Sequence, residues 1–141
     1  MLHEIADSPG ELRPAELHER YLEALASVLE DHGVEPIAER SGLDPADLRS
    51  VIEGDDPGLT LEEAASILAM PEDAPDGETI AAVARDDLLM GMTTAVLDVE
   101  AVESGIDGEL EAREIQSKVE GRFPMTLREF ALLSQYIDGA R

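Results

Sequence analysis

Cysteine and tryptophan are absent from this chain of 141 residues, and aromatic residues make up only 3% of it. The absence of cysteine excludes disulfide bonds, thiol catalysis and cysteine-ligated zinc sites. Long hydrophobic runs are also missing. The most apolar stretch, LLMGMTTAVL at 88–97, is far shorter than the roughly 20 residues of a membrane-spanning helix. Residues 1–10 lack the basic start and apolar centre of a signal peptide. We therefore expect a cytoplasmic protein that does not cross a membrane.

Basic residues are scarce as well. The chain has 10 Lys plus Arg against 33 Asp plus Glu, a formal net charge of −23, and Lys118 is its single lysine. Because 43% of the residues are hydrophobic, this is not a disordered acidic chain. Such a composition is typical of a cytoplasm at very high salt, where the Debye length falls to about 3 Å at 1 M and carboxylate repulsion is screened. An acidic protein from a GC-rich genome at ordinary salt is the alternative.

The apolar residues that are present recur at helical spacing between signals for helix starts and stops. Two capping boxes, Thr60–Glu63 and Thr126–Glu129, mark helix starts, because their side chains satisfy free backbone N–H groups. No stretch alternates in polarity like a half-buried strand, so we expect an all-α fold. The predicted helices span about residues 14–32, 35–41, 45–53, 61–70, 78–92, 98–105, 110–120 and 126–137.

The two halves of the chain match each other in order and spacing. SGLD at 41–44 corresponds to SGID at 104–107, after which the second half has four extra residues, and the capping boxes follow in both halves once Gly58 is left out. Four more residues match between these motifs and the capping boxes: Ser50, Glu53, Gly54 and Pro57 correspond to Ser117, Glu120, Gly121 and Pro124. This repeat predicts an internal duplication of a four-helix unit, although capped short helices can also look alike by chance. We expect an N-terminal arm (1–13), a first unit (14–70), a linker (71–77) and a second unit (78–141), packed into one compact body.

Residues 37–68, IAERSGLDPADLRSVIEGDDPGLTLEEAASIL, resemble the Cro/repressor-type helix-turn-helix. The pattern has an apolar–Ala pair, a turn glycine, a capped second helix and a Gly-then-Pro exit, filled here by Ile37, Ala38, Gly42, Leu43, Asp44, Leu48, Gly54 and Pro57. Over its whole length the chain is also similar to a small uncharacterised family of haloarchaeal proteins without a known activity. The first resemblance implies a fold whose second helix, residues 45–53, enters the major groove of DNA and reads bases.

Charge differs between the two helices that would read DNA. In the first unit the outward positions include Asp47, Arg49 and Ser50, in acidic surroundings that repel phosphates. Residues 109–141 instead hold six acids and five bases. The candidate DNA-facing or partner-facing residues are therefore Arg113, Gln116, Ser117, Lys118, Arg122 and Arg128. The alternative is a solvated face on which Glu109–Arg113 and Glu114–Lys118 pairs support the helix at four-residue spacing.

The apolar stretch at 88–97 predicts a helix that is buried on every side. It forms either the core between the two units or the interface of a homodimer. Helix-turn-helix proteins commonly bind DNA as twofold pairs, which gives the dimer a functional reason. The candidate dimer contacts are Leu89, Met90, Gly91, Met92 and Ala95.

Catalytic chemistry has little support in this sequence. His3, His18 and His32 lack the spacing of metal ligands and are expected to be exposed. Carboxylates are so frequent that no pair stands out as a general acid and base. No glycine-rich phosphate loop is present, and DGELEARE at 107–114 lacks the rest of a calcium loop. We expect a non-enzymatic protein without metal or cofactor. It is either a DNA-associated transcriptional regulator acting through the second unit, or a protein–protein interaction or adaptor module with a degenerate helix-turn-helix.

Overall fold

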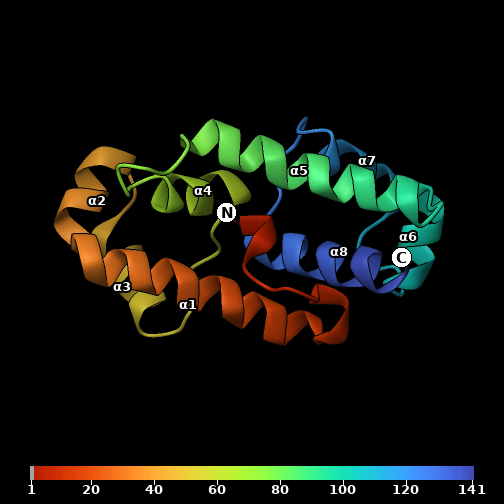
Figure 1. Cartoon of the computed structure of the whole chain (residues 1–141), viewed down its shortest axis with the longest axis horizontal. Helices are drawn as coiled ribbons and strands as arrows, with labels where there is room; N and C mark the ends of the chain where they lie inside the picture. Colours follow the sequence, from red (N-terminus) through yellow and green to blue (C-terminus); the bar gives the residue numbers. More distant parts are fainter. Residues whose placement is uncertain (1) are drawn as a thin grey trace.

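The computed structural model describes residues 2–141 as eight α-helices packed into one body (Figure 1). Two 3-10 turns, η1 (Leu2–Glu4) and η2 (Pro9–Glu11), precede them. The all-α prediction is confirmed, and each predicted helix is present within a few residues of its expected ends. The helices are α1 (Pro14–His32), α2 (Val34–Ser41), α3 (Pro45–Ile52), α4 (Leu61–Leu68), α5 (Gly77–Thr94), α6 (Val99–Gly105), α7 (Ala112–Val119) and α8 (Leu127–Gly139).

The most extensive helix contacts cross from one unit to the other. The long helix of the first unit, α1, packs on α8, and the long helix of the second unit, α5, packs on α4. The apolar stripe of α1 that enters this shared core consists of Leu17, Tyr21, Leu25 and Leu29, all at most 2% exposed. Because each long helix is covered by the closing helix of the other unit, neither unit has a complete core of its own.

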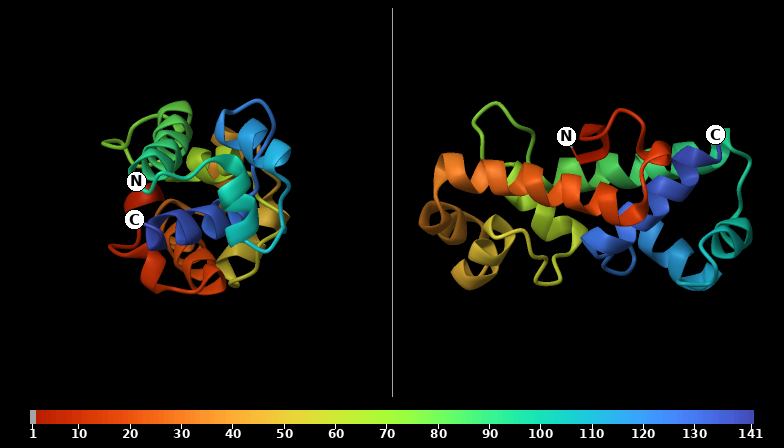
Figure 2. Two further views of the ribbon diagram at one scale, coloured as in Figure 1. Left: turned by 90° about the vertical axis from the view of Figure 1, so that its right-hand side faces the viewer. Right: turned by 90° about the horizontal axis from the view of Figure 1, so that it is seen from below.

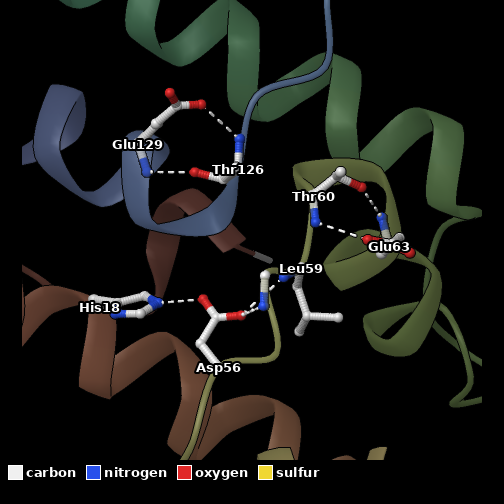
Figure 3. A network of polar contacts seen from close by, with 8 residues as sticks. His18, Asp56, Leu59, Thr60, Glu63, Thr126 and Glu129 are labelled. Atoms are coloured by element: carbon white, nitrogen blue, oxygen red, sulfur yellow. Dashed lines mark hydrogen bonds and ion pairs between the residues drawn. The ribbon is translucent and has the colours of Figure 1, made fainter. Parts of the chain in front are cut away.

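A short backbone bridge joins the two units where α4 and α8 begin. The Leu61 N–H donates to the Met125 carbonyl at 2.7 Å, and the Leu127 N–H donates to the Leu59 carbonyl at 2.8 Å. Thr60 and Thr126 therefore form an antiparallel bridge, and each threonine is also the N-cap in a predicted capping box (Figure 3). These reciprocal hydrogen bonds give the two units a local twofold arrangement. Their origin by duplication stays a prediction.

The N-terminal arm lies against the body, with η1 on α5 and η2 on α8. Leu2 is fully buried, and the Gly10 N–H donates to the Asp138 carboxylate at 2.8 Å. A Cβ at Gly10 would lie 2.5 Å from the backbone of Gly139, so only glycine allows this close approach. The arm thereby covers the end of the body at which α8 stops.

The apolar LLMGMTTAVL stretch forms the end of α5 and the three residues after it, and it is not buried on every side. Leu89 and Met90 are 38% and 67% exposed, whereas Met92 is buried. A Cβ at Gly91 would lie 2.7 Å from Cγ2 of Ile137, so this glycine lets α5 approach α8 within the chain. The homodimer interface stays a prediction, but Gly91 and Met92 are already covered by the chain itself. No helix in residues 2–141 is long and apolar enough to cross a membrane.

Candidate functional site

The helix α7 carries most of the residues predicted to contact DNA or a partner, and one of its faces is open to solvent. Ile115 and Val119 point into the core and are at most 2% exposed, so Arg113 and Gln116 lie on the outer face. Figure 2 shows α3 and α7 on the same side of the molecule, toward its opposite ends. The two helices predicted to be equivalent are thus both accessible from one side.

Lys118 is held inside the protein by two carboxylates. Its side chain is only 16% exposed, and its Nζ lies 2.6 Å from Glu129 and 3.8 Å from Glu114. Glu129 is the carboxylate of the second capping box and also accepts from the Thr126 N–H at 2.9 Å. The predicted Glu114–Lys118 pair is therefore present, and the lysine charge holds α7 against the start of α8.

The arginines of the predicted patch do not form one basic strip. Arg122 pairs with Glu120 in the loop that follows α7. Arg113 and Arg128 are exposed and form no ion pair within residues 2–141, so the predicted Glu109–Arg113 pair is not made. Arg113 lines a groove beside α7, whereas Arg128 lines a separate cavity next to α1. The six predicted contact residues therefore belong to more than one surface.

The equivalent face of the first unit is acidic, and its arginine is neutralised. A guanidinium nitrogen of Arg49 on α3 lies 2.9 Å from the carboxylate of Glu35 on α2. The Ser50 hydroxyl donates back to the Ala46 carbonyl at 3.2 Å, and Asp47 is exposed. Exposed carboxylates on this face, such as that of Asp47, would repel the phosphates of DNA.

An apolar groove of about 370 Å³ lies beside the outer face of α7. Phe123, one of only two phenylalanines, stands at its edge in the α7–α8 loop and is 62% exposed. Phe123 is not among the residues predicted from the sequence, although it stands directly before a proline in a short loop. We name this hollow the α7 groove; it is lined by Arg113, Glu114, Ser117, Lys118, Phe123 and Pro124.

In the first unit, Asp56 precedes a proline as Phe123 does in the second, but Asp56 turns inward (Figure 3). One carboxylate oxygen lies 2.6 Å from Nε2 of His18, and the other accepts from the N–H groups of Gly58 and Leu59 at 2.8 Å. Burial raises the pKa of Asp56, but the hydrogen bonds from Leu59, His18 and Gly58 outweigh it and hold the pKa below its ordinary value. Because an ionised carboxylate only accepts, the His18 Nε2–H donates.

The expectation that all three histidines are exposed is wrong for His18, which is only 6% exposed. Its partner Asp56 lies 38 residues away in the sequence, in a loop that only the fold brings to α1. His32 is exposed as expected, and His3 is partly buried. Within residues 2–141, no three His, Asp or Glu side chains gather closely enough to hold a metal ion.

Comparison with known proteins identifies a family for this chain. No curated protein and no solved structure matches the chain. A family model matches residues 17–140, a span that includes both units, the bridge between them and the α7 groove. Because this match covers most of the chain, the protein belongs to the family of unknown function DUF5791.

Proposed function

We propose that this protein is a non-enzymatic protein–protein interaction module with two helix-turn-helix-like units that do not bind DNA. The observation that carries the proposal is that three of the five cations on the two predicted contact faces, including one on each face, pair with carboxylates of the chain itself. Lys118 is held by Glu129, Arg122 by Glu120, and Arg49 by Glu35. DNA-binding faces need free cations, because phosphate contacts supply much of their affinity. Each of these side chains would have to exchange a carboxylate for a phosphate.

Backbone geometry supports the helix-turn-helix resemblance as part of this proposal. The helix α2 ends at Gly42 with a left-handed backbone (φ 77°), and Asp44 caps α3 by accepting from the Ala46 N–H. The corresponding helices of the second unit follow in the same order, although residues 106–111 separate α6 from α7, where only residues 42–44 separate α2 from α3. We infer that the two units arose by duplication, since the bridge joins their equivalent threonines.

The charge of the whole protein supports a cytoplasm at high salt as its working environment. A net charge of −23 destabilises a compact fold through self-repulsion unless salt screens it. High salt also weakens DNA binding: with about four phosphate contacts, a tenfold rise in salt costs roughly 3.6 decades of affinity. Contacts between apolar groups lack this counterion term, so a protein partner fits these conditions better than DNA does.

The second candidate function is a DNA-associated transcriptional regulator, which two observations favour. Arg113 and Arg128 are exposed without an ion pair inside the described part of the chain. In addition, α3 and α7 lie on one side of the molecule, as the paired reading helices of a dimeric regulator do (Figure 2). With this function, a single chain would supply the two DNA-reading helices that a dimeric regulator takes from two chains.

Fluorescence anisotropy with a labelled random-sequence DNA duplex separates these two functions. The titration is run from the lowest salt at which circular dichroism shows a folded protein up to multimolar salt. Non-specific DNA binders have Kd values of about 10⁻⁴ to 10⁻⁶ M at physiological salt. We expect binding weaker than about 10⁻⁴ M, and no change in the triple variant Arg113→Ala, Lys118→Ala, Arg122→Ala. A tight complex would contradict the proposal, and its loss in a triple variant that circular dichroism shows to be folded would establish α7 as the DNA contact.

A further inference from the structure

The α7 groove differs in charge from other hollows of the surface. Its lining contains two cations and one carboxylate: Lys118 is paired with Glu129 and lies near Glu114, and Arg113 is the cation without an ion pair in residues 2–141. In four further hollows lined by described residues, Asp and Glu outnumber Lys and Arg. With 33 Asp plus Glu against 10 Lys plus Arg, most of the molecule offers an acidic segment few cations with which to pair. The α7 groove is a place where such a segment can approach.

The apolar part of the groove is open to solvent. The Phe123 ring is 62% exposed beside Pro124, and the stems of Arg113 and Lys118 extend the apolar lining. Exposed aromatic rings next to arginine are the residue types that dominate binding energy at protein interfaces. A large apolar side chain from a partner would remove the Phe123 ring from water.

The size of the groove indicates what kind of partner fits. A stable interface between two folded proteins buries about 800 Å² on each partner. The α7 groove, at about 370 Å³, has room for one or two side chains. Its surroundings on α7 are polar and charged rather than apolar, with Glu114 at the groove and Gln116 beside it. A peptide segment with one apolar anchor fits this shape better than a second copy of the chain.

We propose that the α7 groove binds an acidic peptide segment by one large apolar side chain, which packs on Phe123 and Pro124. A carboxylate of the segment pairs with Arg113, the groove cation that has no ion pair within residues 2–141. Lys118 stays with Glu129 and holds the groove wall in place. This inference rests on the proposed interaction function and names the partner chemistry for it.

NMR titration of the ¹⁵N-labelled full chain with synthetic peptides tests the proposal. The probe is a peptide with a central leucine flanked by Asp and Glu, and its controls carry serine in place of leucine or Lys and Arg in place of the acids. We expect the acidic leucine peptide alone to shift the amide signals of Ser117, Gly121 and Phe123. No shift of these signals, or equal shifts with the serine peptide, would overturn the proposal.

Exposed side chains provide variants that leave the fold intact, which circular dichroism verifies. Phe123→Ala and Arg113→Ala are each expected to raise the Kd of the acidic leucine peptide at least tenfold. Arg128→Ala is the matched control, because Arg128 is another exposed arginine without an ion pair in residues 2–141, but it lies outside the groove. We expect it to change the Kd less than twofold. Equal loss in all three variants would contradict a specific site.

The outcomes also separate this inference from the function on which it rests. If the peptide does not bind and the DNA duplex does not bind either, the peptide proposal fails and the interaction function stands. If the duplex, rather than the peptide, shifts the signals of Ser117 and Phe123, both proposals fail. The two titrations therefore report on different claims.

Discussion

The loop after α3 (residues 53–60) and the loop after α7 (residues 120–126) occupy the same place in the two units and use it in opposite ways. In the first loop Asp56 turns inward and bonds His18, and its carboxylate also holds the backbone of the loop. In the second loop Phe123 stays outside and is 62% exposed. A loop that satisfies its own polar groups offers little to a partner, whereas an exposed ring remains available.

The helices before these loops, α3 and α7, also differ at one matching position, which is apolar in α3 and charged in α7. Val51 on α3 is fully buried, so apolar packing secures the end of that helix. At the matching position of α7 stands Lys118, which bonds Glu129 at the start of α8. Because Lys118 reaches Glu129 with its terminal ammonium group, its aliphatic stem lies near the surface and helps to form the α7 groove. The position that is a buried valine in α3 is thus a partly exposed lysine at the edge of a groove in α7.

The sharpest way to break this comparison is to truncate the two loop residues. Asp56→Ala leaves the buried His18 donor and two backbone N–H groups without an acceptor, and should lower the free energy of unfolding by about 2–4 kcal/mol. Phe123→Ala removes an exposed ring and should change it by less than about 0.5 kcal/mol. Chemical denaturation followed by circular dichroism, at a salt concentration that keeps both variants folded, measures the difference. Similar losses in both variants would show that the loops do not differ as described.

Acid should remove the part of the Asp56 contribution that depends on charge. Hydrogen bonds lower the pKa of this carboxyl in the folded protein, whereas in the unfolded chain it returns to about 4. Its stabilisation is therefore present above that pH and is lost as pH falls through the lower folded value. We expect the wild type to lose Tm more steeply below about pH 4 than Asp56→Asn does. Parallel curves of Tm against pH would count against this role.

The capping boxes should behave alike, because both loops end in the same way. Thr60 accepts from the Glu63 N–H at 3.1 Å, and Thr126 accepts from the Glu129 N–H at 3.0 Å. Replacing either threonine by alanine should cost about 1 kcal/mol, measured by the same denaturation curves. If one variant loses more than twice as much free energy of unfolding as the other, the two loops are not equivalent where they lead into α4 and α8.

The smallest expected effects concern the two ion pairs. The Lys118–Glu129 pair is largely screened from water, with side chains 16% and 20% exposed, and Lys118→Met should cost about 1 kcal/mol. The Arg49–Glu35 pair is 58% and 74% exposed, so Arg49→Met should cost less than about 0.5 kcal/mol. Thermal unfolding of both variants compares them directly. If Arg49→Met lowers stability more than Lys118→Met does, Arg49 has the larger structural role and the expectation is wrong.

The candidate site could be predicted only in part from the sequence. The spacing of Arg113 and Lys118 along α7 is local, so their position on or beside its outer face was predictable. Whether each cation is free depends on which carboxylate the fold brings near it. Lys118 pairs with Glu129 from another helix, whereas Arg113 forms no ion pair in the described residues. Phe123 carries no periodic signal at all, because it lies in a loop.

The helices could be predicted from local sequence alone, because their signals act within one or two turns of the chain. Pro14 at a first helical position and the capping boxes at Thr60 and Thr126 act on neighbouring backbone groups and require no knowledge of the fold. The burial of His18 against Asp56 and the exposure of Phe123 could not be predicted in this way. These outcomes depend on which helix faces meet, and that is settled by packing between residues far apart in the chain.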